Sequence, residues 1–345
     1  MNSADRNLSA YDYVLPPGLI AQNPAEPRDS SRLLVVSPTR QIEHRYFWQL
    51  PDWLEAGDLL VFNNTKVIPA RLYGRKSTGA EVEVLLLEDL GSDRWLGLVK
   101  PGRRLPVGSE IVFAGMRAVV QGIDPETHAR ELQFFPEGDR TFWQVLEQIG
   151  QTPLPPYIQH SHATADQYQT VYAQVAGSVA APTAGLHFTP ELLDKLHQKG
   201  INQAFITLHV GLGTFRPVEV ADITQHKMHS EWISVSQEVI AQIIATKKQG
   251  KRVIGVGTTT ARALETSGFS AYRGKTDLMI YPSYQWRVLD GLITNFHLPK
   301  STLLMLVASF LGAGGREFLL DVVYAEAIAK EYRFYSFGDA MLILR

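Results

Sequence analysis

The chain has 345 residues, a length that favours two domains over a single compact core. Hydrophobic residues make up 45% of the sequence and charged residues 20%, which excludes extensive disorder. With a net charge of -2, any contact with nucleic acid needs a local basic surface, and the absence of cysteine excludes disulfide frameworks, thiol nucleophiles and thiolate metal sites.

The sequence also bears on where the protein resides. Its first residues lack the basic and apolar regions of a secretory signal, and its longest apolar run, Leu303 to Leu311, is too short to span a bilayer. We therefore expect a cytoplasmic protein with no membrane partner.

The first half of the chain consists of short strand-like segments. Residues 33–37 (LLVVS) and 58–65 (DLLVFNNT) are apolar runs typical of buried strands. From Val67 to Phe135, turn residues separate six further runs, and apolar and charged residues alternate in AEVEVLLL. This pattern predicts a small antiparallel barrel. The six runs are VIPARLYG, AEVEVLLLEDL, RWLGLVK, SEIVFAG, MRAVVQGI and ARELQFF.

The second half of the chain alternates helices with strands. Thr189 and Ser236 are N-cap residues of predicted helices that end near Gly200 and Gly250, and Ser301 begins an apolar helix. The other predicted elements are strands at 201–210, 252–257, 276–282 and 340–344 and helices at 258–266 and 316–332. Such alternation indicates an α/β domain.

The two parts are predicted to be nested rather than consecutive, because the early strands can pair with the later sheet. We predict an α/β main domain of residues 1–65 and 154–345, with an inserted small antiparallel β-barrel domain of residues 66–153. The proline-rich segment QTPLPP, at 151–156, has the stiffness expected at a domain boundary.

Two glycine-rich segments are suited to a ligand site. Residues 177–190, GSVAAPTAGLHFTP, surround His187 with small residues and end at a helix N-terminus, which favours an anion or another acceptor. A tight turn around a packed histidine explains the same pattern. Residues 209–218, HVGLGTFRPV, place Arg216 in a loop suited to the edge of a pocket.

Two further segments carry polar groups of the kinds that bind substrates. Thr258 and Thr259 follow a strand in VGTTTARALE, where N–H groups and hydroxyls can hold a carboxylate or phosphate, although a simple helix N-cap needs only one threonine. TNFHLPKST sets Asn295, His297 and Lys300 immediately before an apolar helix, and helix initiation by Pro299 and Ser301 is the alternative explanation.

The segment HKMHSEW, at 226–232, combines two histidines with Glu231. These side chains can ligate a divalent metal, but two histidines three residues apart are commonly incidental. A general base or a contact to a polar substrate is the other interpretation.

The order of these motifs narrows the function. They closely resemble the S-adenosylmethionine:tRNA ribosyltransferase-isomerase family of queuosine biosynthesis, from about Tyr11 to the C-terminus. The resemblance rests on YDYVLPPGLIAQNPAEPRDSSRLLV, FNNTKVIPARL, APTAGLHFT, HVGLGTFRPV, MHSEW, VGTTTARALE, DGLITNFHLPKSTLLMLV and YRFYSFGDAML. Two positions depart from the family pattern: Asn64 stands where many members carry Asp, and Ser283 where Gly is common.

The resemblance implies a specific reaction. The ribosyl part of S-adenosylmethionine is transferred and isomerised onto 7-aminomethyl-7-deazaguanine at the tRNA wobble position, giving epoxyqueuosine-tRNA, adenine and methionine. The implied partners are that tRNA and S-adenosylmethionine, a consumed co-substrate, with no cofactor and no metal. The family also implies a β-barrel inserted into an α/β domain, in agreement with the boundaries above.

This chemistry suggests roles for the histidines. A sulfonium acidifies the adjacent ribose C5′ hydrogens, so the reaction needs a base, a departing adenine and a neutral substrate amine. We expect His187 or His229 to act as the base, and His297 to assist proton transfer to adenine or from the amine.

Binding roles follow from side-chain chemistry. The methionyl carboxylate is expected near Thr258 and Thr259, with help from Arg262. The candidates for substrate hydroxyls, phosphates or the base edge are Arg216, Glu231, Asn295 and Lys300. The anticodon loop is expected to contact Lys66, Arg71, Lys100, Arg103 and Arg104, although solvated surface residues explain the same basic groups.

Three other functions remain open from the sequence. An S-adenosylmethionine-dependent methyltransferase would bind the same ligand but release S-adenosylhomocysteine. A noncatalytic tRNA-binding module would rest on the barrel and its basic residues. A metal hydrolase built on His226 and His229 is the third alternative.

Overall fold

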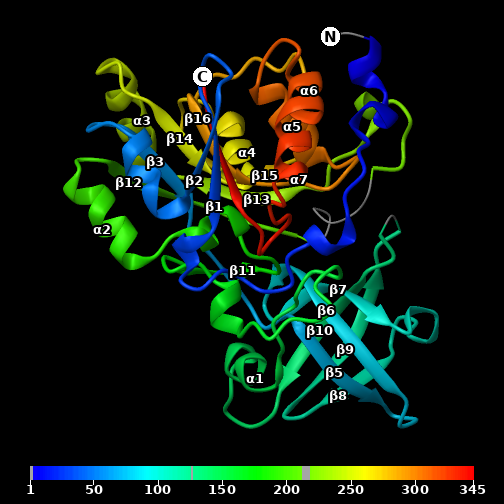
Figure 1. Cartoon of the computed structure of the whole chain (residues 1–345). Coiled ribbons are helices and arrows are strands. Elements are labelled where there is room, and N and C mark those ends of the chain that lie inside the picture. Colours follow the sequence, from blue (N-terminus) through cyan, green and yellow to red (C-terminus); the bar gives the residue numbers. More distant parts are fainter. Residues whose placement is uncertain (1–2, 126, 212–217) are drawn as a thin grey trace.

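The protein consists of a helix-flanked sheet and a barrel (Figure 1). The computed structural model describes residues 3–125, 127–211 and 218–345. In Figure 1 the sheet and its helices form the upper part and the barrel the lower part, and both parts of the predicted fold class are confirmed.

The main sheet has nine strands in the order β15-β13-β12-β3-β14-β16-β17-β1-β2. The strands are β1 (Arg32–Val36), β2 (Ile42–Tyr46), β3 (Leu59–Asn63), β12 (Asn202–His209), β13 (Glu231–Val235), β14 (Val253–Val256), β15 (Tyr272–Thr276), β16 (Gly291–Asn295) and β17 (Ala340–Leu344). As expected, the early strands pair across the barrel, because β3 lies between β12 and β14 and β1 pairs with β17.

Helices bury both faces of this sheet. Leu60 of β3 packs into one core with η5 (Phe47–Trp53) and α2 (Pro190–Gln198), whereas Val61 packs into a second core with α3 (Gln237–Lys248) and α5 (Thr302–Phe310). Successive residues of a strand point to opposite faces, so an unbroken apolar run such as β3 is what a sheet covered on both sides requires. The second core also contains α4 (Thr258–Ser267) and the helical stretch of α6 (Gly315–Glu317), the π-helical η11 (Phe318–Tyr324) and α7 (Ala325–Ala329).

The inserted strands close into a six-stranded antiparallel barrel in the order β10-β7-β6-β5-β8-β9. They are β5 (Arg71–Lys76), β6 (Glu81–Gly91), β7 (Arg94–Lys100), β8 (Glu110–Phe113), β9 (Met116–Ile123) and β10 (Arg130–Pro136), which confirms the six predicted runs. The helix α1 (Phe142–Ile149), which the sequence did not predict, packs its apolar side into the barrel core. The domain boundaries at residues 66 and 154 stay a prediction.

One predicted strand is wrong. Residues 277–280 of the expected strand 276–282 have no regular structure, and β15 ends at Thr276. The apolar side chain of Ile280 is buried in the second core, so burial rather than strand pairing accounts for the apolar run.

Several remaining elements border the sheet and the barrel. The strands β4 (Thr65–Val67) and β11 (Val175–Ser178) form a small parallel pair between the two parts. Short 3-10 turns are η1 (Ser3–Arg6), η2 (Leu8–Tyr11), η3 (Pro17–Leu19), η4 (Arg28–Ser30), η6 (Gly102–Arg104), η7 (Ala165–Tyr168), η8 (Thr183–His187) and η10 (Ile223–Gln225).

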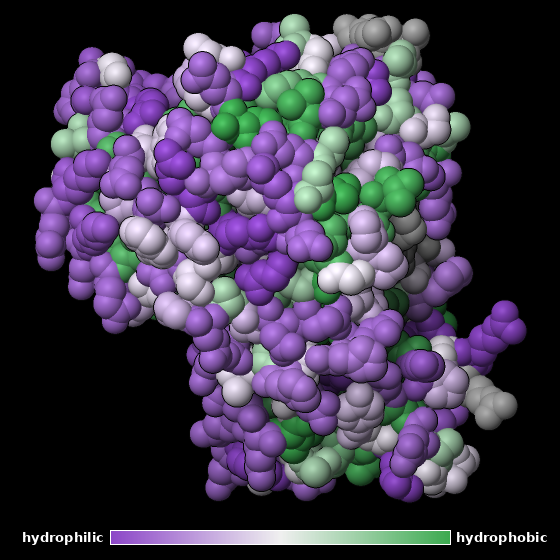
Figure 2. Space-filling model, viewed as in Figure 1, coloured by the Kyte–Doolittle hydropathy of each residue, from purple (hydrophilic) through white to green (hydrophobic). Residues whose placement is uncertain are grey.

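The surface and the helices show how apolar residues are distributed. Figure 2 shows a face that is mostly hydrophilic, with small and separate hydrophobic areas.

Among the described residues, no single helix is long and apolar enough to cross a membrane. By length and composition alone, the helices Thr302–Phe310 and Gly315–Ala329 together reach the size of a membrane span, but they are bent by 116° against each other.

The sheet topology determines where a site can form. The strands β12, β3, β14 and β16 are adjacent and parallel. Their carboxyl ends therefore lie at one edge of the sheet, the usual position of ligand sites in α/β folds.

Candidate functional site

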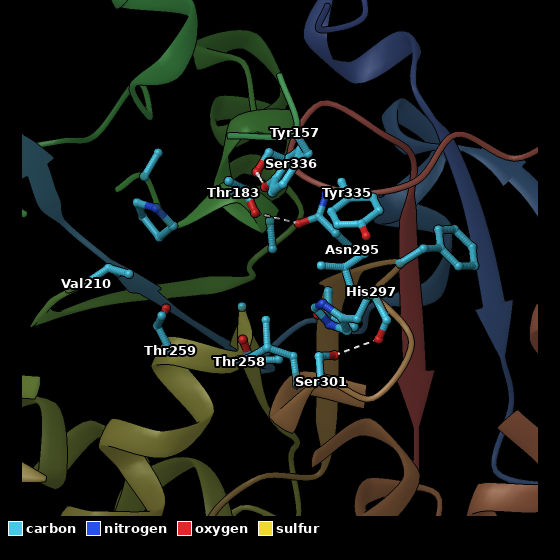
Figure 3. Close-up of a pocket in the computed structure, with 18 of the residues that line it drawn as sticks. Tyr157, Thr183, Val210, Thr258, Thr259, Asn295, His297, Ser301, Tyr335 and Ser336 are labelled. Carbon is cyan, nitrogen blue, oxygen red and sulfur yellow. Dashed lines mark hydrogen bonds between the residues drawn. The ribbon is translucent and has the colours of Figure 1, made fainter. Parts of the chain in front are cut away.

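A cavity of about 170 Å³ lies at this edge of the sheet. Its walls come from segments that are far apart in sequence, namely the segment before η8, the start of α4, the loop after β16 and the loop before β17. Figure 3 shows their side chains converging, with the labelled residues Tyr157, Thr183, Val210, Thr258, Thr259, Asn295, His297, Ser301, Tyr335 and Ser336.

One wall is the N-terminus of α4. Gly257 has a φ of 92°, which glycine adopts without strain, and it turns the chain from β14 into the helix. Thr258 and Thr259 both line the cavity, as the sequence predicted for this turn. Asn63, at the end of β3, donates its amide hydrogen to Thr259 Oγ1 over 3.4 Å. The wall thus offers hydroxyls and helix N–H groups, which favour an anionic group of a ligand.

His297 lines the cavity beside this wall. Its Nε2 lies 2.8 Å from Thr294 Oγ1, and its backbone N–H donates to Tyr324 over 2.9 Å. Burial lowers the pKa of His297 to about 3, because the charged imidazolium loses its hydration. The ring is therefore neutral at physiological pH.

His187 is buried behind the cavity rather than in its wall. Its Nδ1 lies 2.7 Å from Ser31 Oγ and its Nε2 3.1 Å from the amide nitrogen of Asn295. Since an amide NH₂ only donates, Nε2 accepts and Nδ1 carries the proton. Burial lowers the pKa of His187 to about 4. Both ring nitrogens are engaged, so in this structure His187 orients Asn295.

Asn295 connects His187 to the cavity. Its Oδ1 accepts a hydrogen bond from Thr183 Oγ1 over 3.1 Å, and both residues line the cavity. With the donor side of its amide on His187 and the acceptor side on Thr183, the side chain has one fixed orientation. Figure 3 shows the contact between Asn295 and Thr183.

The loop before β17 forms the opposite wall. Tyr335 and Ser336 line the cavity, and Ser336 Oγ lies 2.5 Å from the hydroxyl of Tyr157. The backbone N–H of Tyr335 donates to the carbonyl of Phe296 over 3.1 Å, which fixes the loop to the segment that carries His297.

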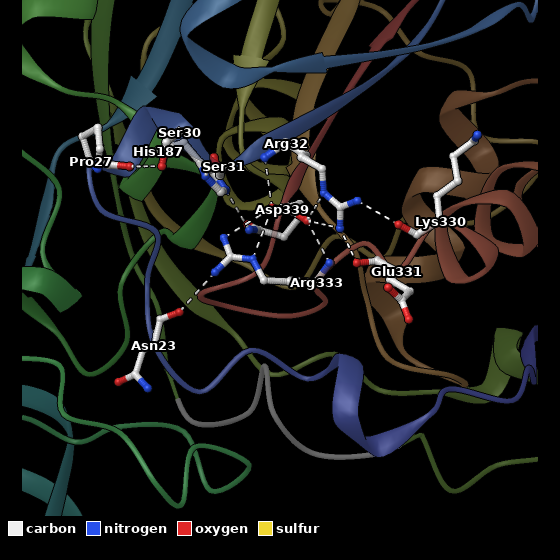
Figure 4. A network of polar contacts seen from close by, with 11 residues as sticks. Asn23, Pro27, Ser30, Ser31, Arg32, His187, Lys330, Glu331, Arg333 and Asp339 are labelled. Atoms are coloured by element: carbon white, nitrogen blue, oxygen red, sulfur yellow. Dashed lines mark hydrogen bonds and ion pairs between the residues drawn. The ribbon is translucent and has the colours of Figure 1, made fainter.

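A buried carboxylate holds this loop in place (Figure 4). Asp339 is 1% exposed and accepts hydrogen bonds from the backbone N–H of Arg32 over 3.0 Å and of Arg333 over 2.8 Å. The guanidinium groups of Arg32 and Arg333 also form ion pairs with the carboxylate of Asp339, at 3.2 and 3.3 Å. The network joins the Ser31-Arg32 segment, which contacts His187, to the loop that lines the cavity.

Glu231 and Arg262 lie together, but they pair with each other. Their side chains form a buried ion pair, and Arg262 Nε also donates to the carbonyl of Leu278 over 3.0 Å. Glu231 accepts a hydrogen bond from the backbone N–H of Gly211 over 3.3 Å. Neither residue lines the cavity, so the pair supports the elements around the site.

The other predicted site residues have different positions. Lys300 lines the cavity, has a φ of 57°, and its Nζ lies 2.6 Å from Asp12. His229 is half-buried in the segment between η10 and β13, and it does not line the cavity. Arg216 lies outside the described residues. Within the described part of the chain, no group of three or more histidine, aspartate or glutamate residues is arranged to hold a metal ion.

His209 is a residue at this edge of the sheet that the sequence did not single out. It ends β12, its Nδ1 lies 2.8 Å from Thr65 Oγ1, and its ring stacks on Trp232 with 5.1 Å between centroids. Gly177 lies so close that an added Cβ would be 2.8 Å from His209 Nε2. Burial lowers the pKa of His209 to about 4. Its place at a strand end, beside Gly211, was the available signal.

The predicted basic residues lie on or beside the barrel. Lys66, Lys100 and Arg103 are exposed. Arg71 is half-buried and its Nη1 lies 2.9 Å from Glu83 Oε1. The side chain of Arg104 lies outside the described part of the structure.

Comparisons with known proteins agree with the motifs. A family model described as queuosine biosynthesis protein matches residues 8–343. The chain is 57% identical to the S-adenosylmethionine:tRNA ribosyltransferase-isomerase of Nostoc sp., over 99% of this chain and 92% of the relative. It is 52% identical to the protein of that name from Thermotoga maritima, over 98% of this chain and 99% of the relative.

A solved structure extends the likeness to the fold. The crystal structure of an S-adenosylmethionine tRNA ribosyltransferase from Thermotoga maritima aligns with 97% of this chain and 100% of its own, at a TM-score of 0.55 and 41% identity in that alignment. The resemblance found in the sequence is confirmed, and the chain belongs to the queuosine biosynthesis protein family.

Proposed function

We propose that this protein transfers and isomerises the ribosyl group of S-adenosylmethionine onto 7-aminomethyl-7-deazaguanine at the tRNA wobble position. The products are epoxyqueuosine-tRNA, adenine and methionine. The observation that carries the proposal is the cavity at the carboxyl ends of the parallel strands, where the family's motifs meet around neutral histidine and hydroxyl groups. S-adenosylmethionine is a consumed co-substrate, and the reaction takes place in the cytoplasm.

The methionyl carboxylate binds at the start of α4. Thr258 and Thr259 present hydroxyls there, and the first N–H groups of the helix have no partner within the helix. The apolar residues Leu298, Pro299 and Leu303 line the same cavity and suit the adenine ring. Lys300 lines the same cavity and is paired with Asp12, so a hydroxyl of the substrate suits it better than a phosphate of the tRNA.

His297 is the group best placed to move a proton. Of the three histidines proposed for catalysis, it is the one that lines the cavity. Its neutral ring can accept the acidified C5′ proton or pass a proton to the departing adenine. His187 acts through Asn295, which it holds in position, and His229 acts only if the substrate reaches it from outside the cavity.

The activity is tested with purified full-length protein, S-adenosylmethionine and tRNA that carries 7-aminomethyl-7-deazaguanine. Adenine release together with an epoxyqueuosine mass in the tRNA is the expected result. A methyl-sized mass gain with S-adenosylhomocysteine would establish a methyltransferase instead, and tRNA binding without either product would indicate a noncatalytic module.

The catalytic assignment needs matched variants. His297→Gln keeps a polar group beside Thr294 but removes the base, so adenine release is expected to fall by about 100-fold or more, the usual contribution of a general base. His162→Gln, at an exposed position, is the control. A normal rate in His297→Gln would refute the role of His297.

A further inference from the structure

A groove of about 490 Å³ lies where the barrel meets the proline-rich segment after α1, apart from the catalytic cavity. Arg71, Tyr73 and Leu85 come from the barrel strands β5 and β6, and the facing side is formed by Gln151 to Pro156.

Backbone hydrogen bonds fix the two sides of the groove relative to each other. The N–H of Arg71 donates to the carbonyl of Gln151 over 3.0 Å, and the N–H of Gln151 donates back over 2.8 Å. Pro153 and Pro155 are buried and stiffen the facing side. The groove therefore exists before any ligand binds.

The barrel side of the groove carries an aromatic platform. Tyr73 is 52% exposed on the outer face of β5. In the strand register it lies opposite Glu83, which in turn lies opposite Lys100 of β7. Arg71, on the same face as Tyr73, pairs with Glu83 at 2.9 Å. An exposed ring among apolar walls suits a stacked base, whereas the pairing of Arg71 with a carboxylate limits its attraction for phosphate.

The groove directly adjoins the catalytic cavity. Tyr157 lines the cavity and the next residue, Ile158, lines the groove. Likewise Val179 lines the groove, while Ala181 lines the cavity. The segments 157–158 and 179–181 therefore contribute to both hollows.

We infer that this groove binds the base of an unpaired anticodon-loop nucleotide next to the modified one, stacked on Tyr73. The inference rests on the proposed function, because a wobble base in the cavity brings its neighbour along the strand to the groove. Stacking on an aromatic side chain is the common way in which proteins hold splayed single-stranded bases.

The test measures binding of the full chain to an anticodon stem-loop that carries 7-aminomethyl-7-deazaguanine. Tyr73→Ala is expected to weaken binding by about 5- to 150-fold, the range for one base-aromatic stack. Tyr73→Phe retains the ring and is expected to bind like the wild type. Phe269→Ala, which removes a 46% exposed ring from the main domain, is the matched control.

Two stem-loops that lack the base on one or the other side of the wobble nucleotide identify the occupant. On one of these two stem-loops, the wild type should bind more weakly than on the intact loop, by about the factor that Tyr73→Ala costs on the intact loop. Tyr73→Ala should bind that same stem-loop as tightly as it binds the intact loop. The inference is overturned if Tyr73→Ala binds the intact loop as tightly as the wild type does. It is also overturned if Tyr73→Ala weakens binding to all three RNAs by the same factor, and either result would leave the groove to another partner.

The same samples separate this inference from the proposed function. A wild-type protein that releases adenine while Tyr73→Ala binds normally refutes only the groove. A wild-type protein that shows the stacking pattern but releases no adenine refutes only the proposed reaction.

Discussion

Burial of neutral histidines should make the stability of this protein fall steeply in mild acid. Burial lowers the pKa of His297 to about 3 and of His187 to about 4, whereas a histidine of the unfolded chain has a pKa of about 6.5. The unfolded state thus binds more protons below about pH 6.5, so stability is complete above that pH and is lost as the pH falls toward these folded-state values.

The size of the effect follows from these pKa values. Near pH 5, an unfolded-state histidine is almost fully protonated while His297 and His187 are still neutral in the fold. The difference destabilises the folded state by about 2 kcal/mol for each histidine relative to pH 8. Because the unfolded-state pKa dominates at pH 5, the figure changes little if the folded pKa differs somewhat from about 3 or 4.

Urea unfolding at pH 8 and pH 5, followed by tryptophan fluorescence, measures this dependence. His297→Gln should reduce the stability difference between the two pH values by about 2 kcal/mol, whatever the substitution costs at pH 8. His162→Gln, at an exposed position, should leave the difference unchanged. If His297→Gln and the wild type show the same pH dependence, His297 is not a buried neutral group and the reasoning is refuted.

Three substitutions test other parts of the structure. Asp339→Asn leaves one of two backbone N–H groups without its acceptor and should destabilise the fold by about 2 to 4 kcal/mol, seen as a lower urea midpoint. Gly177→Ala places a Cβ 2.8 Å from His209 at a φ of 144° and should cost about 1 to 3 kcal/mol, whereas Gly18→Ala, with no atom within 4 Å, should change stability by less than about 0.5 kcal/mol. Asn295→Ala should lower kcat/KM for S-adenosylmethionine about 10-fold or more in the adenine-release assay, while unchanged kinetics would remove Asn295 from the site.

Local sequence signals predicted most of the elements. Thr189, Ser236 and Ser301 each accept a hydrogen bond from the backbone N–H three residues later, so these caps were readable from residue type alone. The strands β2, β13 and β16 were missed; each is only five residues long, and in β2 polar residues dominate. An apolar run predicts burial but does not indicate whether its backbone pairs with another strand. For this reason residues 277–280 were wrongly predicted as part of a strand.

The sequence predicted part of the site. The predictions that failed concern side chains that pair with residues far away in the sequence. Thr258, Thr259, Asn295 and His297 meet at one cavity because they lie at or just beyond the ends of the adjacent parallel strands β14 and β16. Glu231 and Arg262 were each assigned to substrate, yet each is the other's partner. No spacing rule reveals a pair that joins a strand to a helix 31 positions away.

The position of β17 has a consequence for how the protein is made. This strand, Ala340–Leu344, lies inside the sheet, between β16 and β1, so the sheet stays divided until these residues have been synthesised. The barrel and α1 occupy one continuous stretch of sequence, residues 71–149, and can fold while the ribosome is still translating the second half. A nascent chain therefore carries a finished barrel beside an open apolar sheet edge, and a truncation that removes Ala340–Leu344 should leave the barrel folded and the sheet prone to aggregation.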